Sequence, residues 1–406
     1  MSRLRTALLI VGAIAALDVG LAQIAKRMLP QWYSTMPASN PRMASPIYHH
    51  GLRPMMDVKT RVGPAVYSLA TNSLGMVDAK PRTIDPRGKA CRYLVIGDSF
   101  TEGFGVGWEK SFAGILAGRW AERGVDLLNA GVVSYSPTIY YRRIRHLIED
   151  QKLQFGAAVV FIDMGDPSDE WRSYDLDAKG DVVPIGHVWQ IRPMRDPTWR
   201  DQVRFWIQDN SVIAQLVKDL AGKLRKPRKP AAVRPGTVPA PPPLPHRPVA
   251  PLPLGEIAVP PPLSGAPVPP PGFVGTLGVE NARWSIDPEA WIGWGREGTL
   301  VAAERMDRLA LLLRQHNIKL TVAVYPWPDQ LFAGDRDSAQ TRFWREWART
   351  RNAGFIDLFP AFFNGDDALT TIRRYFVPGD FHWNAAGHAL VADRVDREIE
   401  PRQACR

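Results

Sequence analysis

The sequence lacks the features that mark several large protein classes. Its 406 residues contain only two cysteines, Cys91 and Cys405, so the chain can close at most one disulfide within itself. No internal repeat recurs, and no nucleic-acid-binding motif accompanies the net charge of +10. The glycine-rich stretch from Gly103 to Gly107 lacks the Gly-Lys-Ser/Thr of a phosphate-binding loop. These absences argue against a repeat protein, a nucleic-acid partner and a P-loop enzyme.

The excess of positive charge is partly local. Basic residues cluster between Lys223 and Arg234, at the start of a proline-rich tract that runs from about 226 to 271. A basic run in such a tract indicates a solvated linker. The alternative is contact with an anionic envelope polymer or with lipid headgroups.

One long apolar run stands at the N-terminus. Residues 7–25 are apolar apart from Asp18 and Gln23, and the run is flanked by basic residues on both sides. This length suits one membrane-spanning helix of about 20 residues. The basic start predicts a cytoplasmic N-terminus, with the rest of the chain outside the cytoplasm, which is the periplasm in a bacterium. Because Asp18 is costly in lipid, a cleaved signal ending near Ala22 is the alternative.

The middle and the end of the chain alternate between strand and helix patterns. Predicted strands cover 92–97, 125–129, 157–163, 319–325 and 354–358, and predicted helices cover 111–123, 138–150, 298–316, 340–351 and 384–398. Such alternation predicts a parallel sheet covered on both faces. The expected fold is an α/β three-layer sandwich with a five-stranded, parallel, flavodoxin-like sheet. On this arrangement Cys91 and Cys405 both fall at the inactive end of the sheet, where they form a disulfide or remain two buried thiols.

These patterns divide the chain into five parts. They are an anchor or signal segment at 1–27, a turn-rich lead-in at 28–90, the two halves of the α/β domain at 91–170 and 296–400, and an insertion at 171–295 that carries the Pro-rich arm of about 226–271. An irregular stretch as long as the insertion cannot lie inside a compact domain. We therefore expect it to form a cap near the active edge or an exposed arm.

Reactive side chains follow two of the predicted strands and helices. In open α/β sheets, ligands bind beyond the carboxyl ends of the strands. The first strand ends there in Gly97-Asp98-Ser99, and Asp380-Phe381-His382 precedes the last helix. A serine hydroxyl needs a base, and the base needs an acid that orients it. The sequence therefore predicts Ser99 as nucleophile, His382 as base and Asp380 as the acid.

With these motifs the sequence resembles the SGNH (GDSL-like) hydrolases over roughly residues 65–170 and 296–400. Ser99 matches the family nucleophile in its Gly-Asp-Ser block, and Asp380 and His382 match the C-terminal acid and base. The stretch from Tyr67 to Asp78 is similar to a lead-in of exported members. The resemblance implies an SGNH hydrolase fold and serine-dependent ester chemistry.

The sequence departs from the family pattern at three places. The spacing Asp380-x-His382 replaces Asp-x-x-His and is similar to exported polysaccharide O-acetyltransferases of the alginate-acetylating type. Ser134 stands at the oxyanion glycine of the second block, where Gly131 is another candidate donor, and Gly165 replaces the asparagine of the third block. The predicted oxyanion hole thus comprises Ser99, Ser134 and Gly165.

The predicted activity is hydrolysis of an acyl or acetyl ester outside the cytoplasm, for example on a carbohydrate, through an acyl-serine intermediate. No cofactor and no metal are expected, because Asp163 and Asp166 match no metal-binding spacing and are expected to anchor the catalytic edge. One alternative is O-acetyl transfer by the same triad. The other is a non-catalytic envelope protein that binds carbohydrate or assists assembly, which the loss of the third-block asparagine favours.

Overall fold

The computed structural model describes residues 2–28, 41–62, 65–88, 91–186, 199–214, 216–217, 220, 270, 272–273 and 275–405. The chain divides into two compact units: one comprises 1–40, 58–67 and 194–247, and the other comprises 41–57, 68–193 and 248–406. The basic run and the Pro-rich arm predicted at about 226–271 lie outside the described residues, apart from residue 270.

The strands of the described residues form one large sheet and two small ones. They are β1 (Arg42–Ser45), β2 (His49–Leu52), β3 (Asp57–Val62), β4 (Ala65–Thr71), β5 (Val77–Asp78), β6 (Arg92–Ile96), β7 (Asp126–Asn129), β8 (Ala157–Ile162), β9 (Tyr174–Leu176), β10 (Val182–Pro184), β11 (Lys319–Val324) and β12 (Gly354–Asp357). The large sheet has the order β12-β11-β8-β6-β7-β5-β4-β3, while β1 pairs with β2 and β9 with β10.

The five predicted strands form the parallel part of the large sheet. These are β6, β7, β8, β11 and β12, and every pairing among them is parallel. All residues of β6 and β8 are buried, as expected for central strands that have helices on both faces. The predicted α/β alternation is therefore confirmed, and the carboxyl ends of these strands meet at one edge.

The prediction of a five-stranded, wholly parallel sheet is wrong, because the lead-in contributes three more strands. β5 pairs antiparallel with β7, and β4 pairs antiparallel with β5. β4 is the sequence AVYSLAT, in which Tyr67 and Leu69 are buried while Val66 and Ser68 are exposed. That alternation with a period of two is a strand signal that the proline-containing steps around it obscured.

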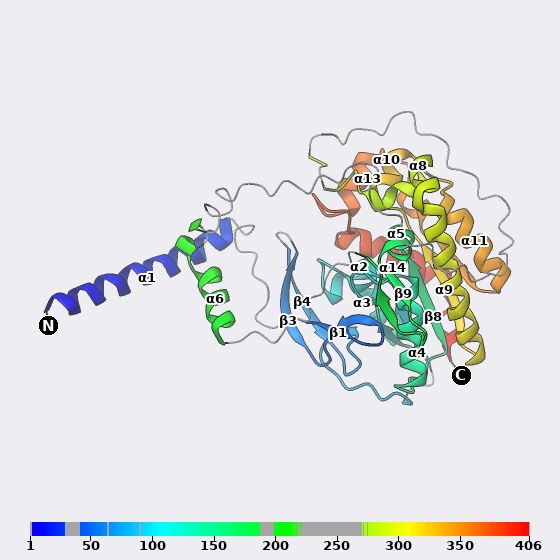
Figure 1. Ribbon diagram of the computed structural model, residues 1–406, viewed down its shortest axis with the longest axis horizontal. Coiled ribbons are helices and arrows are strands. Elements are labelled where there is room, and N and C mark those ends of the chain that lie inside the picture. The colour runs from blue at the N-terminus through cyan, green and yellow to red at the C-terminus, as the bar shows by residue number, and fades with distance from the viewer. Residues whose placement is uncertain are drawn as a thin grey trace. The chain divides into compact units, whose positions relative to one another are not determined.

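Helices cover both faces of the parallel strands. The longer ones are α3 (Phe112–Ala121), α4 (Pro137–Glu149), α9 (Arg296–Gln315), α11 (Ala339–Arg351) and α14 (Ala385–Glu398). The shorter ones are α2 (Ser99–Glu102), α5 (Asp166–Arg172), α8 (Pro288–Ala290), α10 (Pro328–Ala333), α12 (Phe359–Phe362) and α13 (Ala368–Tyr375), with the 3₁₀-helices η2 (Trp108–Lys110), η3 (Glu280–Ser285) and η5 (Pro401–Ala404) and the π-helix η4 (Trp291–Gly295). Helix α3 packs against α14, and α9 packs against α4, α5 and α11, which lies beside it in Figure 1.

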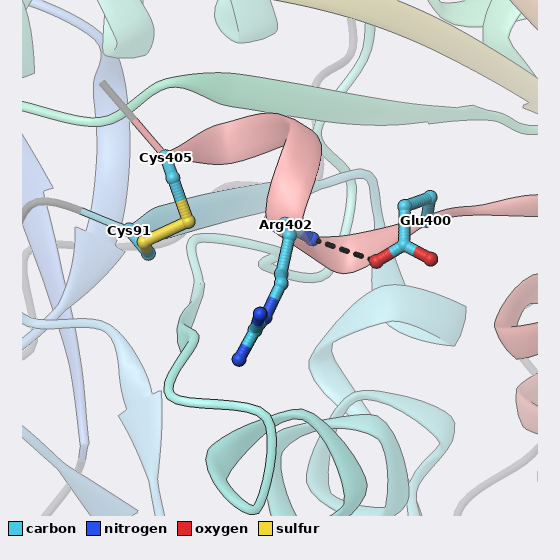
Figure 2. Close-up of a disulfide and its surroundings, with 4 residues drawn as sticks. All are labelled: Cys91, Glu400, Arg402 and Cys405. Carbon is cyan, nitrogen blue, oxygen red and sulfur yellow. Dashed lines mark hydrogen bonds between the residues drawn. A yellow bond between two sulfur atoms is a disulfide. The ribbon is translucent and has the colours of Figure 1, made fainter.

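A disulfide closes the end of the sheet opposite to the carboxyl ends. Cys91 directly precedes β6, and Cys405 directly follows η5 (Figure 2). Their sulfur atoms are bonded, and their Cα atoms lie 4.0 Å apart. Of the two arrangements left open by the sequence, the structure thus has the disulfide rather than two free thiols.

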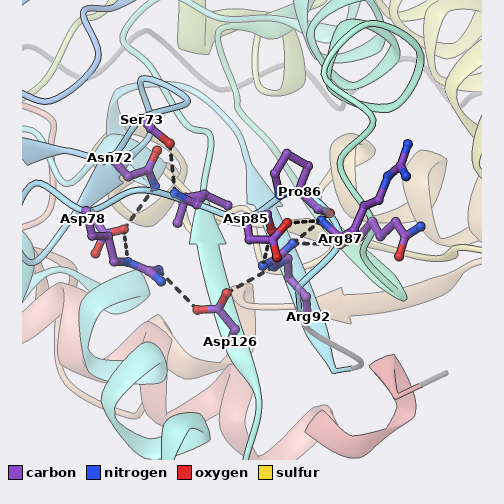
Figure 3. Close-up of polar contacts among 11 residues, drawn as sticks. Asn72, Ser73, Asp78, Asp85, Pro86, Arg87, Arg92 and Asp126 are labelled. Atoms are coloured by element: carbon purple, nitrogen blue, oxygen red, sulfur yellow. Dashed lines mark hydrogen bonds and ion pairs between the residues drawn. The ribbon is translucent and has the colours of Figure 1, made fainter.

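Paired charges surround the same end of the sheet (Figure 3). Arg92, the first residue of β6, is only 2% exposed, and its Nε donates to Asp126 at the start of β7. Its remaining donors reach the carbonyl oxygens of Asp85, Pro86 and Gln154. Arg82 donates to both Asp126 and Asp78, which ties the lead-in to the parallel strands.

The N-terminal segment is a single helix, α1 (Ser2–Met28), in the unit that also holds α6 (Trp199–Asn210). Within that unit, the backbone N–H of Ile213 donates to Asp18 and the Gln23 amide donates to Asn210. Among the residues that the structure describes, no helix combines the length and the apolar character of a membrane span. The membrane span predicted for this segment is therefore not confirmed.

Candidate active site

The turn after β6 places a serine at the carboxyl edge of the sheet. Asp98 caps α2, because its Oδ1 accepts a hydrogen bond from the Phe100 amide at 2.9 Å. Gly97 permits the sharp turn, since a Cβ atom at this position would lie only 2.2 Å from Oγ1 of Thr101. Ser99 is thereby held at the first position of α2, where it is 6% exposed.

The loop between α13 and α14 brings a histidine and an aspartate to this serine. Oγ of Ser99 lies 2.7 Å from Nε2 of His382, and Nδ1 of His382 lies 2.5 Å from Oδ1 of Asp380. The same Oδ1 accepts the backbone N–H of His382 at 3.0 Å. One carboxylate oxygen of Asp380 therefore holds both the ring and the backbone N–H of His382. This explains how an acid only two positions before the histidine can still orient its ring.

The partners of His382 set its proton positions. An ionised carboxylate only accepts hydrogen bonds, so Nδ1 carries the proton and Nε2 is free to accept the Ser99 hydroxyl proton. Burial acts to raise the pKa of Asp380, but the hydrogen bonds and charge of His382 outweigh it, and the pKa lies below its ordinary value. Asp380 is thus an anion at neutral pH and can stabilise an imidazolium.

Aromatic side chains enclose the imidazole. The ring centroid of His382 lies 4.3 Å from that of Phe381, 4.9 Å from that of Phe100 and 5.1 Å from that of Phe104. Phe381 in turn stacks on Trp327, which is buried. These contacts fix the ring plane and keep water from competing for its nitrogens.

Three buried carboxylates lie beneath the serine, at the ends of β6 and β8. Burial, followed by the charge of Asp163, raises the pKa of Asp98 well above its ordinary value. Burial likewise raises the pKa of Asp163 to about 6 and that of Asp166 well above normal. Their hydrogen-bond donors are Tyr325, Trp327, Tyr140 and backbone N–H groups.

Asp163 and Tyr325 link the ends of three strands beneath the nucleophile. The Tyr325 hydroxyl donates to Asp163 at 2.9 Å and lies 3.3 Å from Oδ1 of Asp98. Asp163 was expected to anchor the catalytic edge, and its contacts are of that kind. Tyr325 was not among the predicted site residues, although the Tyr-Pro-Trp-Pro stretch at the end of a predicted strand was a signal for it.

The structure changes the predicted oxyanion hole. The Gly165 amide donates to Oδ1 of Asp163 at 2.6 Å, so the prediction of Gly165 as an oxyanion donor is wrong: the carboxylate two residues earlier folds back onto it. The Gly131 amide is likewise bound, to Oδ1 of Asn129. In the described part of the chain, neither the Ser99 amide nor the Ser134 amide has an acceptor. These two amides are therefore the candidates for an oxyanion.

Two further buried side chains near the site have structural contacts. The ring nitrogen Nδ1 of His388 accepts the backbone N–H of Phe112. Trp327 is 3% exposed, and its Nε1 donates to Asp163. Across the described residues, no group of three or more His, Cys, Asp and Glu side chains is arranged to hold a metal ion.

No family model matches the chain, and no curated protein matches its sequence. By structure the chain is similar to GDSL-type hydrolases. TesA covers 76% of this chain over 98% of its own length, with 11% identity and a TM-score of 0.37. A protein from Desulfitobacterium hafniense DCB-2, whose name places it in the lipolytic G-D-S-L family, covers 76% of this chain and 99% of its own at 11% identity and a TM-score of 0.34.

A catalytic mutant of Axe2, an acetylxylan esterase from Geobacillus stearothermophilus, covers 78% of this chain and 98% of its own length. It is 11% identical, with a TM-score of 0.35. Values this low do not transfer an activity from one protein to another, so the activity is inferred from the geometry of the site.

Proposed function

We propose that the protein is a serine-dependent ester hydrolase in which Ser99, His382 and Asp380 form a catalytic triad. The observation that carries the proposal is the continuous hydrogen-bonded chain from Oγ of Ser99 through both ring nitrogens of His382 to Asp380, with distances of 2.7 and 2.5 Å. Hydrogen bonds of this length suit proton transfer from an attacking hydroxyl.

The proposed reaction proceeds in two halves. Oγ of Ser99 attacks the ester carbonyl carbon as its proton moves to Nε2 of His382, and the amides of Ser99 and Ser134 donate to the developing oxyanion. The imidazolium then gives its proton to the leaving alcohol, which leaves an acyl-Ser99. Water attacks this ester with His382 as base, and the acid is released with free Ser99.

Acyl transfer is the second candidate. In it, a sugar hydroxyl rather than water attacks the acyl-Ser99 ester in the second half of the reaction. The Asp380-x-His382 spacing favours it, because that spacing is similar to polysaccharide O-acetyltransferases. An acetylated oligosaccharide carrying labelled acetyl groups separates the two candidates. Label recovered only as free acetate supports hydrolysis, and label recovered on a second oligosaccharide supports transfer.

We propose that the reaction occurs outside the cytoplasm, with the N-terminal helix as the anchor. The Cys91–Cys405 disulfide supports this, because disulfides form and persist mainly in oxidising compartments. Large apolar side chains on α1 that are at least 48% exposed also support it: Leu9, Ile10, Ile14, Leu17, Leu21 and Ile24. Release of the protein from washed membranes by high salt would contradict the anchor.

A fluorophosphonate probe and p-nitrophenyl acetate test the triad directly. We expect the wild-type protein to be labelled at Ser99, and Ser99→Ala to lose labelling and about 10⁴-fold or more of kcat. The matched control is Ser338→Ala, which removes the cap of α11 and a hydrogen bond to Asp335, leaves the contacts of the triad in place and should leave activity intact. An unlabelled wild-type protein, or equal labelling of Ser99→Ala, would favour the non-catalytic binding protein.

A further inference from the structure

A hairpin of the lead-in contacts the loop that carries Ser134. Strands β1 and β2 pair antiparallel, with Ala44 opposite His50. From β1, Arg42 makes two hydrogen bonds of 2.7 and 3.0 Å to the carboxylate of Glu102 in α2. From β2, Nε2 of His50 lies 2.8 Å from the backbone oxygen of Val133. Each strand thus provides one contact to the active edge.

These contacts hold the backbone of Val133 on both sides. Its N–H donates to Oε2 of Glu102 at 2.8 Å, and its carbonyl oxygen binds His50. Glu102 and His50 are 2% and 0% exposed. Both side chains are therefore shielded from competition by water, and the backbone of Val133 has little freedom to rotate.

The tautomer of His50 follows from its partners. A carbonyl oxygen only accepts, so Nε2 must carry the proton. Burial lowers the pKa of His50 to about 3, which keeps the ring neutral and leaves Nδ1 as an acceptor. Nδ1 of His49 lies 2.8 Å from it and is then the donor. The Tyr135 hydroxyl, donating to the backbone oxygen of His50 at 2.7 Å, holds the strand itself in place.

The His50 contact determines the direction of the Ser134 amide. The carbonyl of Val133 and the N–H of Ser134 belong to one planar trans peptide group, in which they point in opposite directions. A carbonyl that faces His50 therefore aims the Ser134 N–H away from the hairpin. Ser134 has φ = 63°, a conformation rare outside glycine that persists only where neighbouring contacts enforce it.

The loop also lies against the nucleophile turn. The amide of Val132 donates to the carbonyl of Gly97 at 3.2 Å, and a Cβ at Gly131 would lie 2.9 Å from the Glu102 nitrogen. We propose that His50 is a positioning residue that orients the Val133–Ser134 peptide so that its N–H can donate to the oxyanion formed at Ser99. This inference rests on the proposed function, and it gives the β1–β2 hairpin a role in the transition state.

Two substitutions of His50 distinguish the loss of its hydrogen bond to Val133 from a general loss of packing around the side chain. In glutamine, the amide nitrogen is as many bonds from Cα as Nε2 is in histidine, so His50→Gln retains a donor for the Val133 carbonyl. In asparagine, the side-chain nitrogen corresponds to Nδ1, so His50→Asn can contact His49 but cannot reach Val133. The control His146→Gln changes a histidine of α4 whose ring is hydrogen-bonded to Asp150.

We measure kcat and KM for p-nitrophenyl acetate. The concentration of active sites, determined by titration with the fluorophosphonate, is used to calculate kcat. We expect His50→Asn to lose about 10- to 100-fold in kcat with KM changed less than about twofold. His50→Gln and His146→Gln should stay within about threefold of wild type. Equal losses in the Asn and Gln variants, an effect on KM alone, or no effect of His50→Asn would overturn the proposal.

A thionoacetate substrate gives a second readout that does not depend on how much protein folds. Its sulfur accepts hydrogen bonds poorly, so an intact oxyanion hole distinguishes it from the oxygen ester. We expect the ratio of oxygen-ester to thiono-ester kcat to fall about tenfold in His50→Asn and to stay at the wild-type value in His50→Gln. An unchanged ratio in His50→Asn would overturn the inference. An unlabelled, inactive wild-type protein would instead overturn the proposed function on which it rests.

Discussion

Buried charged side chains have different partners at the two ends of the parallel strands. At the amino end, Arg92 is buried with all its contacts to Asp126 and to carbonyl oxygens, next to a disulfide (Figures 2 and 3). At the carboxyl end, Asp98, Asp163 and Asp166 are buried together, and their donors are hydroxyl, indole and backbone groups. Removing the partner of a buried charge destabilises a fold, whereas carboxylates crowded together in the interior already reduce its stability.

This difference indicates that the amino end contributes stability and the carboxyl end contributes chemistry. Functional sites commonly retain strained or poorly compensated groups that reduce stability. Substitutions at the amino end should therefore change the free energy of unfolding and leave kcat intact. Substitutions at the carboxyl end should change kcat, or should even stabilise the protein.

After Ser99→Ala, the largest effect is expected from Asp380→Asn at the carboxyl end. Asparagine can donate to Nδ1, which would favour the wrong tautomer of His382, so kcat should fall about 10²- to 10⁴-fold while the unfolding midpoint changes little. The measurement is p-nitrophenyl acetate turnover with urea unfolding in parallel. Asp367→Asn is the matched control, because Asp367 only caps α13. Full activity of Asp380→Asn would remove the acid from the triad.

Removing the disulfide at the amino end should instead lower the stability of the protein and leave its activity intact. Replacing both Cys91 and Cys405 with serine should lower the free energy of unfolding by about 2–5 kcal/mol, because the bond closes a loop across a sequence separation of 314. Urea titration measures the loss, and kcat should stay within about threefold of wild type. Wild-type protein kept in dithiothreitol should show the same change. A folded double variant without activity would contradict the division of roles.

Arg92→Met tests the charge at the amino end. It leaves the Gln154 carbonyl oxygen without a donor, removes a second donor from the carbonyl oxygens of Asp85 and Pro86, and leaves Asp126 with Arg82 as its remaining partner, so we expect a loss of about 2–4 kcal/mol in the free energy of unfolding. Arg87→Met, at an exposed position of the lead-in, is the control and should cost less than about 0.5 kcal/mol. Similar losses in both variants would mean that the buried contacts of Arg92 do not contribute to the stability of the protein.

Asp169→Asn at the carboxyl end should raise the free energy of unfolding rather than lower it. Burial raises the pKa of Asp169 to about 7, above the ordinary value near 4, so the folded state holds its proton more tightly. The stability linked to this proton is complete below about pH 4 and is lost as the pH rises to about 7. Asn cannot ionise and can still accept from Ser173, so the variant should gain about 1–2 kcal/mol at pH 8 and little at pH 4. Urea unfolding at both pH values checks this, and a gain that does not depend on pH would contradict it.

Much of the fold follows from patterns that are local in the sequence. The continuous apolar runs of β6 and β8, each bounded by helix patterns, were sufficient to predict parallel strands, because a buried central strand needs apolar residues on both faces. The order of the strands also places Gly97-Asp98-Ser99 and Asp380-x-His382 at one edge. The three residues could therefore be named from the sequence, and the structure brings them within hydrogen-bonding distance.

Other features depend on contacts between distant residues. The Gly165 amide was predicted to be an oxyanion donor, but only the folded turn shows that Asp163 occupies it. His50 was not among the predicted site residues, because its contact with Val133 spans 83 positions and leaves no local signal. The same holds for the lead-in strands, whose addition to β7 was not predicted.

By itself, the sequence determined the alternation of strands and helices, the identity of the three triad candidates and the edge at which they meet, since these follow from periodicity and chain order. The tertiary structure alone decided that the sheet is mixed, that Cys91 and Cys405 are bonded, and which backbone amides remain open at Ser99. The physical reason is that a hydrogen bond or a disulfide requires particular atoms to meet in space, and no local pattern encodes the partner when the two residues are far apart in the chain.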